Sequence, residues 1–386
     1  MRPDHHAEGS TIDFSSEESF PMSNQTKETY TLGVLHGDAI GPEIVPVSVK
    51  VADAAMKAVG ANPIKWKELP LGFDAIAQLN SHIPESTLEG LAETDGWILG
   101  PHDSAAYPEP FKSQLNPSGT IRKYFDLFAN IRPAKSFGVD PTQRKMDLVV
   151  VRENTEGFYA DRSTYKGTGE FMPTPDVAIA MGIITRKGCE RIAREAFELA
   201  SRRRKHLTIV HKANVLKLTT GMFRDVCKEI AAEYPDVEVD DFHIDAFTVH
   251  LVRRAEDFDV IVTENMFGDI LSDLTGELAG SLGIAPSLNA SEDRAMAQAS
   301  HGSAPDIAGQ NRANPTAMIL STAMLLDWLG RRYSDELMTQ SAQLIDEAVA
   351  KTILSGISTS DMGGSATCTE FGEEVARAVT DRAISK

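Results

Sequence analysis

The sequence predicts an α/β fold built around a substantially parallel sheet, and two observations support this prediction. Short apolar runs alternate with segments of helical periodicity along most of the chain, a pattern typical of βα units. The chain also has 386 residues, 42% of them hydrophobic and 24% charged, which suffices for two or three domains with large buried cores. Because these values are ordinary for folded proteins, the composition excludes a disordered or fibrous chain.

The first βα unit starts near Tyr30. An apolar run at residues 32–35 leads into a turn at residues 37–43, which reads Gly-Asp-Ala-Ile-Gly-Pro-Glu and opens a helix expected to end near Val59. Further strands are expected at residues 96–99, 127–131, 147–151, 207–210 and 259–262. Further helices are expected near residues 186–201, 219–233, 266–281, 313–330 and 334–351. No repeat or low-complexity linker divides the sequence, so composition places no domain boundary.

Residues 1–28 are polar and acidic, and we interpret them as a disordered leader or, because Met22 lies within them, as a consequence of start-site choice. They lack the basic start and apolar run of a secretory signal, and the sequence contains no apolar stretch of about 18 residues that would span a membrane. The three cysteines, Cys189, Cys227 and Cys368, indicate neither a disulfide framework nor a metal site. We therefore expect a cytoplasmic protein without a membrane partner.

The charge balance makes nucleic acid a poor partner, because 56 acidic against 38 basic residues give a net charge of −18. One basic run, at residues 202–205, interrupts this pattern. It follows an amphipathic stretch and precedes an apolar strand. We interpret it as the last turn of a helix, where cations are favoured.

An acidic pair follows the strand expected at residues 259–262. Asp269 and Asp273 are four residues apart, so a helix would place both carboxylates on one face. Adjacent like charges repel unless a cation lies between them, and a site made only of oxygen ligands suits Mg²⁺ or Mn²⁺. The alternative is a solvated helix start, where acidic residues interact favourably with the helix dipole.

Cationic residues occur beside several expected strand ends, where α/β sheets bind ligands. Guanidinium groups hold carboxylates through paired hydrogen bonds, so Arg122, Arg132 and Arg152 together would suit a small polyacid. Each arginine alone is more often part of a surface ion pair. Lys212 also follows a strand, with Asn214 two residues later. A neighbouring metal and arginines would lower the pKa of Lys212 and let it act as a base, whereas the alternative is an ordinary exposed lysine.

A segment of small residues at positions 301–309 reads His-Gly-Ser-Ala-Pro-Asp-Ile-Ala-Gly, and Asn314 and Pro315 then open a helix. Small side chains let the backbone approach a ligand such as a pyrophosphate. An acidic residue here would bond a ribose 2′-hydroxyl and repel a 2′-phosphate. Because the sequence contains no Gly-x-Gly-x-x-Gly or Walker loop, a dinucleotide would have to bind in a non-Rossmann manner.

Taken together and in this order, these motifs resemble the β-decarboxylating 2-hydroxyacid dehydrogenases. This family contains the isocitrate, homoisocitrate, isopropylmalate and tartrate/D-malate dehydrogenases. The resemblance covers nearly all of the chain from Tyr30 onward. It is carried by eight segments, at residues 37–43, 126–133, 152–159, 212–215, 245–246, 265–273, 301–314 and 361–367.

The resemblance implies an isopropylmalate dehydrogenase-like fold of two α/β domains with parallel and mixed sheets around a cleft. Residues 29–127 and 280–386 would form the larger, discontinuous cofactor-binding domain, and residues 128–279 the smaller dimerisation domain. The resemblance also implies a homodimer with shared active sites. Lys212, Asn214 and Asp245 would then act across the dimer interface.

The resemblance also implies a role for each site residue. Tyr159 and Lys212 would be the acid and the base. The divalent metal would be held by Asp245, Asp269 and Asp273. The substrate would be held by Arg122, Arg132, Arg152, Asn214, Asn116 and Ser118. NAD would be bound by the first turn and the small-residue segment, through Ile40, His301, Gly302, Ser303, Ala304, Asp306 and Asn314.

The implied reaction is the oxidative decarboxylation of a 3-substituted malate to a 2-oxo acid, CO₂ and NADH. The metal would lower the pKa of the substrate hydroxyl for Lys212 and stabilise the enolate that Tyr159 protonates. Asp306 matches the aspartate of NAD-dependent members, where NADP-dependent members carry a lysine. The chain departs from the family before His301, where Gln298 replaces the usual glutamate and so removes a carboxylate on the nicotinamide side.

We expect the 3-substituent to be polar or carboxylated, as in isocitrate or homoisocitrate. Isocitrate enzymes place a serine and an asparagine before the first arginine, and this chain has the two types exchanged, at Asn116 and Ser118. Desolvating these groups against an alkyl substituent costs on the order of 1–3 kcal/mol each. The alternatives are 3-isopropylmalate or tartrate/D-malate dehydrogenase and, from another class, a non-catalytic regulatory subunit of a heteromeric isocitrate dehydrogenase. Gln298 supports that last reading, whereas the retained acid, base and aspartates oppose it.

Overall fold

A ten-stranded sheet dominates the computed structural model, which describes residues 27–138, 145–164 and 167–384. The predicted leader at residues 1–28 lies outside this part of the chain except for its last two residues, of which Lys27 pairs with Asp95. The strand order is β2-β1-β3-β12-β11-β4-β5-β10-β8-β9. Most neighbours are parallel, but β11 is antiparallel to both β12 and β4, and β4 is antiparallel to β5. The predicted α/β class is therefore confirmed, with a mixed sheet.

The strands predicted from apolar runs agree with the observed ones, except that β4 begins two residues later than expected and extends further. The sheet contains β1 (Thr31–Leu35), β2 (Lys65–Glu68), β3 (Gly96–Leu99), β4 (Ala129–Lys135), β5 (Asp147–Glu153), β8 (His206–His211), β9 (Glu238–His243), β10 (Val260–Thr263), β11 (Leu288–Ala290) and β12 (Ala295–Gln298). The sequence analysis missed β2 and β9, which are rich in charged residues, and β11 and β12, which are very short. These strands form because a neighbouring strand supplies their hydrogen bonds.

Helices cover both faces of the half of the sheet that contains β5, β8 and β10. On one face, α5 (Arg186–Arg202) and α6 (Thr219–Ala231) pack on Val149, Val151 and Val260. On the other face, α7 (Ile244–Arg254) and α8 (Asn265–Ala279) pack on Val150 and Ile261. Alternate residues of a strand point to opposite faces, so these continuous apolar strands are buried on both sides.

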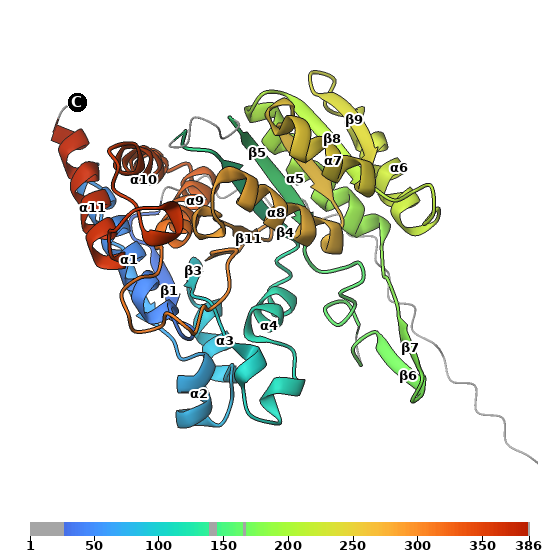
Figure 1. The fold of residues 1–386 in the computed structure, drawn as a ribbon, viewed down its shortest axis with the longest axis horizontal. Helices are drawn as coiled ribbons and strands as arrows, with labels where there is room; N and C mark the ends of the chain where they lie inside the picture. The colour runs from blue at the N-terminus through green and yellow to red at the C-terminus, as the bar shows by residue number, and fades with distance from the viewer. Residues whose placement is uncertain (1–26, 139–144, 165–166, 385–386) are drawn as a thin grey trace, which may run out of the picture.

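The other half of the sheet carries the remaining helices (Figure 1). A shared core joins β1 to α1 (Gly41–Ala58), α9 (Thr316–Tyr333), α10 (Glu336–Leu354) and α11 (Cys368–Ile384). Three shorter helices, α2 (Gly72–Leu79), α3 (Glu85–Ala92) and α4 (Pro117–Tyr124), lie at the lower end of this half in the same view. Among the described residues, no helix is long and apolar enough to cross a membrane.

The two halves of the sheet draw on different parts of the chain. The strands β1, β2, β3, β11 and β12 come from residues 31–99 and 288–298, whereas β4, β5, β8, β9 and β10 come from residues 129–263. The pairing of β11 with β4 joins the halves into one sheet. The domain boundaries expected from the resemblance stay a prediction.

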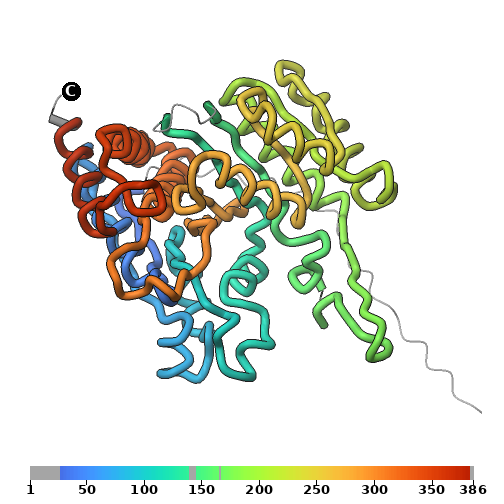
Figure 2. Tube along the Cα trace, viewed as in Figure 1, coloured from blue at the N-terminus to red at the C-terminus, as the bar shows by residue number. Residues whose placement is uncertain are grey.

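A two-stranded antiparallel arm of β6 (Glu170–Thr174) and β7 (Val177–Ala180) projects away from the body (Figures 1 and 2). Every residue of both strands is exposed, including the apolar side chains Phe171, Met172, Val177 and Ile179. An isolated hairpin is at best marginally stable in water. Exposed apolar groups gathered on one hairpin are typical of interaction surfaces.

The basic run at residues 202–205 was predicted to form the last turn of a helix, but only Arg202 lies in α5 and the other three residues follow its end. Nε of Arg203 lies 2.7 Å from Oδ1 of the fully buried Asp259, and its Nη2 lies 2.7 Å from Asp147. The backbone N–H of Arg204 also donates to Asp259, at 2.8 Å. Arg203 therefore neutralises a buried carboxylate just before β10, and the backbone of Arg204 donates a hydrogen bond to it.

Candidate active site

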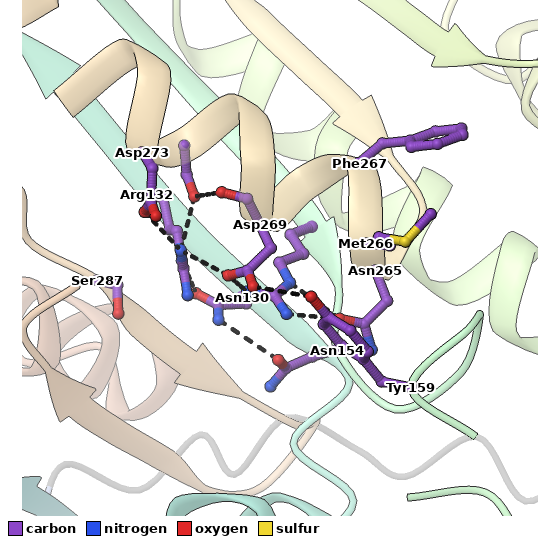
Figure 3. Close-up of polar contacts among 12 residues, drawn as sticks. Asn130, Arg132, Asn154, Tyr159, Asn265, Met266, Phe267, Asp269, Asp273 and Ser287 are labelled. Carbon is purple, nitrogen blue, oxygen red and sulfur yellow. Dashed lines mark hydrogen bonds and ion pairs between the residues drawn. The ribbon is translucent and has the colours of Figure 1, made fainter. Parts of the chain in front are cut away.

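The start of α8 positions the acidic pair predicted from the sequence. The Glu264 carboxylate caps the helix by accepting hydrogen bonds from the backbone N–H groups of Met266 and Phe267, both at 3.2 Å. Figure 3 shows Asp269 and Asp273 directed toward Arg132, with Phe267 pointing away. The spacing of four residues thus has the consequence expected of a helix.

Arg152, at the end of β5, is the most buried cation of the site, with 1% of its surface exposed. Its Nε and Nη2 atoms donate to Oδ1 of Asn265 at 3.0 and 2.6 Å, and Nη1 pairs with Asp269. A Cβ atom at Gly268 would lie 2.5 Å from Cγ of Arg152. Glycine at this position therefore lets α8 lie directly on the arginine side chain.

Arg132 of β4 connects the acidic pair to the centre of the sheet. Its Nη1 atom lies 3.3 Å from Asp269 and 3.9 Å from Asp273, and donates to Oγ of Ser272 at 2.6 Å. Its Nε atom donates to Asn130 at 3.1 Å. Burial and the neighbouring Arg152 lower the pKa of Arg132 to about 10. Burial raises the pKa of Asp269, but Arg152 and Arg132 outweigh this effect and hold it below its usual range.

Tyr159 completes this group from the loop after β5. Its hydroxyl donates to Oδ2 of Asp269 at 3.1 Å, and its ring faces the guanidinium groups of Arg152 and Arg162, 5.7 and 5.2 Å from its centre. Burial and Asp269 raise the pKa of the phenol, so it is protonated at neutral pH. The sequence analysis missed Arg162, because its loop has neither helical nor strand periodicity.

Arg122 lies on α4. The start of this helix contains Asn116 and Ser118, the two polar residues predicted to bind the 3-substituent of the substrate. The Asn116 side chain caps this helix, accepting from the Gly119 N–H at 2.8 Å and from the Ser118 hydroxyl at 3.1 Å. Ser118 also contacts Nε2 of His102 at 3.0 Å. Arg122 donates to Gln298 at 3.0 Å, and its pKa is lowered by burial and by three other arginines.

We call the following residues the arginine–aspartate cluster: Arg122, Arg132, Arg152, Arg162, Tyr159, Asp269 and Asp273.

Three residues predicted to act across a dimer interface lie outside this cluster. Lys212, after β8, pairs with Asp245, at the start of α7, with Nζ 2.6 Å from Oδ1. Asn214 is exposed in the same loop as Lys212. In residues 27–138, 145–164 and 167–384, no hydrogen bond or ion pair links Lys212 or Asp245 to the cluster, and no three His, Cys, Asp or Glu side chains group as a metal site. One chain therefore brings together Asp269 and Asp273, but not Asp245.

His211 holds the loop that carries Lys212. Its Nε2 atom lies 2.9 Å from the Asp241 carboxylate, and its Nδ1 atom accepts the Ala213 N–H at 3.1 Å. These partners require a neutral ring with the proton on Nε2. Burial lowers the pKa of His211, and the opposing effect of Asp241 is smaller. The sequence analysis did not single out this residue.

A pocket of about 460 Å³ lies between the first βα turn and the small-residue segment. Five residues predicted to bind the cofactor line it, namely Ile40, His301, Gly302, Ala304 and Asn314. Of the other two, Ser303 accepts the Ile40 N–H through its carbonyl at 3.2 Å, and Asp306 is exposed nearby without lining the pocket.

Asp361, which the sequence analysis did not propose as a site residue, also lines this pocket. Its carboxylate accepts from Ser281 at 2.7 Å and from the Asn314 amide at 3.0 Å. The Nε2 atom of His301 is buried and has no hydrogen-bond partner among the described residues. An unpaired polar atom in a pocket wall is free to bond a ligand.

Comparisons with known proteins identify relatives of this chain. The chain matches the profile of the isocitrate/isopropylmalate dehydrogenase family over residues 31–375. It is 40% identical to the isocitrate/homoisocitrate dehydrogenase of Thermus thermophilus, over 91% of this chain and 98% of that protein. It is 41% identical to the 3-isopropylmalate dehydrogenase of Archaeoglobus fulgidus, over 89% and 97% of the two chains. A crystal structure of isocitrate dehydrogenase from Methylococcus capsulatus is 38% identical, covers 91% of this chain and 99% of its own, and superposes with a TM-score of 0.81.

Proposed function

Because the chain belongs to the isocitrate/isopropylmalate dehydrogenase family, we propose that it oxidises and decarboxylates a 3-substituted malate with NAD and Mg²⁺ or Mn²⁺. The family supports an oxidoreductase that acts on a CH–OH group. The observation that carries the proposal is the arginine–aspartate cluster, in which buried guanidinium groups meet carboxylates and a protonated phenol. Such a set holds a polyacid and donates a proton to it.

The balance of charge supports a substrate with three carboxylates, such as isocitrate or homoisocitrate. The cluster contains four arginines but only two aspartates, so its cations exceed its anions before any ligand binds. Ser118, one turn before Arg122, and Asn116, the N-cap of the same helix, add polar groups rather than an apolar lining. A substrate with an alkyl substituent would desolvate these groups without replacing their hydrogen bonds.

Tyr159 and Lys212 would carry the two proton transfers. The raised pKa of Tyr159 keeps its proton available for the carbon that loses CO₂, and the hydrogen bond to Asp269 orients the hydroxyl. Lys212 would take the proton of the substrate hydroxyl, and His211 and Asp241 hold the backbone of its loop.

The donor set fits a hard divalent cation, because Asp269 and Asp273 offer only oxygen ligands from one helix face. Asp245 from a second copy of the chain would complete the set. When bound, the cation supplies Lewis acidity at the substrate hydroxyl and the developing enolate.

We assign NAD to the pocket between the first turn and the small-residue segment. Its glycine and alanine lining permits close approach of a phosphate backbone, and the free Nε2 atom of His301 offers one hydrogen bond. The exposed carboxylate of Asp306 would repel a 2′-phosphate, which favours NAD over NADP.

The same site requires a homodimer, because Lys212 and Asp245 are separate from the cluster within one chain. Apolar side chains are exposed on the arm and on α7 and α8, two helices that contact each other, at Phe171, Met172, Ile179, Val249, Val252 and Ile270. A two-fold interface over this surface would bury them and bring Lys212 of one copy to Asp269 of the other.

The test is a substrate panel of isocitrate, homoisocitrate, 3-isopropylmalate, tartrate and D-malate, run with NAD⁺ and with NADP⁺. We expect NADH formation with a tricarboxylic substrate, loss of activity with EDTA and recovery with Mg²⁺ or Mn²⁺. Turnover of 3-isopropylmalate alone would reassign the substrate. If a folded, metal-loaded dimer turns over none of these substrates, the proposed activity is overturned and the regulatory-subunit alternative is favoured.

A further inference from the structure

Arg162 lies in the turn that follows Tyr159, and both its backbone and its side chain are held in place. Its backbone N–H donates to the carbonyl of Tyr159 at 3.3 Å, and its Nη1 atom donates to the carbonyl of Asn154 at 3.2 Å. Its guanidinium carbon lies 5.2 Å from the centre of the Tyr159 ring. Lys123 of α4 donates to two carbonyls of the same loop, at 3.1 and 2.9 Å, and so fastens the loop to α4.

No carboxylate of the described residues pairs with Arg162, whereas Arg132 and Arg152 both pair with Asp269. Its Nε atom is buried without a hydrogen-bond partner in this part of the chain. Burial and Arg152 lower the pKa of Arg162 more than the nearby Asp161 and Asp269 raise it. A cation that is withdrawn from water without a counter-ion carries a desolvation penalty, which an arriving anion relieves.

The guanidinium group of Arg162 presents a free edge to such an anion. Only its Nη1 atom makes a hydrogen bond within the described residues, so Nε and Nη2 are left without partners there. These two N–H groups form one side of the guanidinium fork, which a carboxylate accepts through two parallel hydrogen bonds.

The location of Arg162 relates it to the 3-substituent of the proposed substrate. Arg122, Arg132 and Arg152 would hold the carboxylates of the malate core, as the resemblance implies, and Arg162 is the cation that this assignment leaves over. Under the proposed function, Tyr159 protonates the carbon that loses CO₂, and the same carbon carries the 3-substituent. A guanidinium that lies over the Tyr159 ring is therefore beside that substituent. After burial, Arg162 lowers the pKa of Arg122 more than any other charge, so it lies toward Arg122 and α4.

We propose that Arg162 is a specificity-determining residue, whose guanidinium binds the carboxylate of the 3-substituent in a tricarboxylic substrate. This inference rests on the proposed function and adds to it the residue that selects the substrate class. An alkyl substituent would keep water from the guanidinium without replacing the lost hydrogen bonds. A carboxylate would replace them with stronger, charge-assisted ones.

Three variants test this role with a tricarboxylic substrate and with D-malate, which has no 3-substituent. Arg162→Gln removes the charge, Arg162→Lys keeps it, and Lys123→Gln removes only the bonds between the loop and α4. We expect Arg162→Gln to lower kcat/KM about 30-fold more for the tricarboxylic substrate than for D-malate, with the KM for NAD⁺ nearly unchanged. Arg162→Lys should keep most of the wild-type preference, and Lys123→Gln should affect both substrates equally. Equal losses for both substrates in Arg162→Gln, or an equally selective loss in Lys123→Gln, would overturn the proposal.

Binding measured without turnover separates this inference from the proposed function. Calorimetric titrations with isocitrate, homoisocitrate and D-malate, in Mg²⁺ and without NAD⁺, compare ligands that have a third carboxylate with the unsubstituted core. We expect the wild type to bind one of the tricarboxylates about tenfold more tightly than D-malate. Arg162→Gln should lose this preference and keep its affinity for D-malate, with thermal unfolding confirming that both proteins are folded.

The outcomes distinguish the two proposals. If the wild type turns over a tricarboxylic substrate and Arg162→Gln keeps the binding preference, only this inference fails. If the wild type shows the expected preference, the variant loses it, and neither protein turns over any substrate, only the proposed activity fails. If the wild type binds none of the three ligands and turns over no substrate, both fail.

Discussion

The arginine–aspartate cluster and the pair of Lys212 and Asp245, which we propose to share one active site, differ in how many contacts hold them in place. The arginine–aspartate cluster is built on three buried arginines, Arg122, Arg132 and Arg152. Its Asp269 alone contacts Arg132, Arg152 and Tyr159. The pair of Lys212 and Asp245 consists of a single contact, and the Asp245 side chain is 69% exposed. Water screens an exposed pair, so it does not hold a fixed geometry by itself.

This difference indicates which part of the proposed active site has a fixed geometry in a single chain. The cluster is built where β4, β5 and α8 pack together, so its geometry is established as the core forms. The Lys212 half has a well-held backbone, but its side chain reaches only Asp245. We interpret it as a group that a second copy of the chain completes.

The largest expected effect is at the centre of the cluster. Asp269→Asn removes the carboxylate that joins two arginines to Tyr159, and we expect activity to fall by about 10³-fold or more. The fold should survive, because Asn265 still holds Arg152. Steady-state kinetics with a magnesium titration and circular dichroism measure the two effects. Wild-type activity in this variant would contradict the metal and proton roles assigned to the cluster.

Mixing two inactive variants tests whether the arginine–aspartate cluster and the Lys212 of one active site come from different copies of the chain. Lys212→Met and Asp269→Asn should each be inactive as a homodimer. Refolded together, they should recover about a quarter of wild-type activity, because half of the random dimers contain one intact site. Mixing Asp269→Asn with Asp273→Asn is the control, since both changes fall in the same half. Equal recovery in the control, or none in the first mixture, would show that the site is not shared as proposed.

A smaller effect is expected from the arm that would hold the two copies together. Phe171→Asp combined with Ile179→Asp places charges on its exposed apolar surface. We expect dissociation to monomers in light scattering and an activity loss of about tenfold at low protein concentration. Leu354→Asp is the control, because Leu354 is exposed on α10, in the other half of the sheet. A dimer that withstands both arm substitutions would exclude the arm as the main contact.

The smallest effect concerns His211 and pH. The folded pKa of His211 is lowered, so the unfolded chain binds a proton more readily than the folded one. This contribution to stability is complete above the unfolded pKa of about 6.5 and decreases as the pH falls below it. We expect the acid-induced drop in Tm to be about 2 °C smaller in His211→Gln, as measured by scanning calorimetry. Parallel pH profiles in the two proteins would argue against a neutral His211.

The spacing of residues along the chain was sufficient to predict most of the apolar strands, the long helices and one acidic helix face. Periodicity identified most of the apolar strands and long helices, and the interval between Asp269 and Asp273 predicted their shared helix face. The sequence also placed Arg132 and Arg152 at the ends of apolar strands, and the structure pairs these strands as β4 and β5. These inferences need only residues that are close together along the chain.

The tertiary structure decided which distant residues meet. Arg122 and Gln298 are 176 positions apart, and their contact depends on the place of β12 beside β3. The sequence predicts that Asn116 binds the substrate, but in the structure its side chain also caps α4. Arg162 joins the cluster from a loop without periodicity. Strand order and loop packing create such contacts, and they arise from long-range burial that local sequence patterns do not encode.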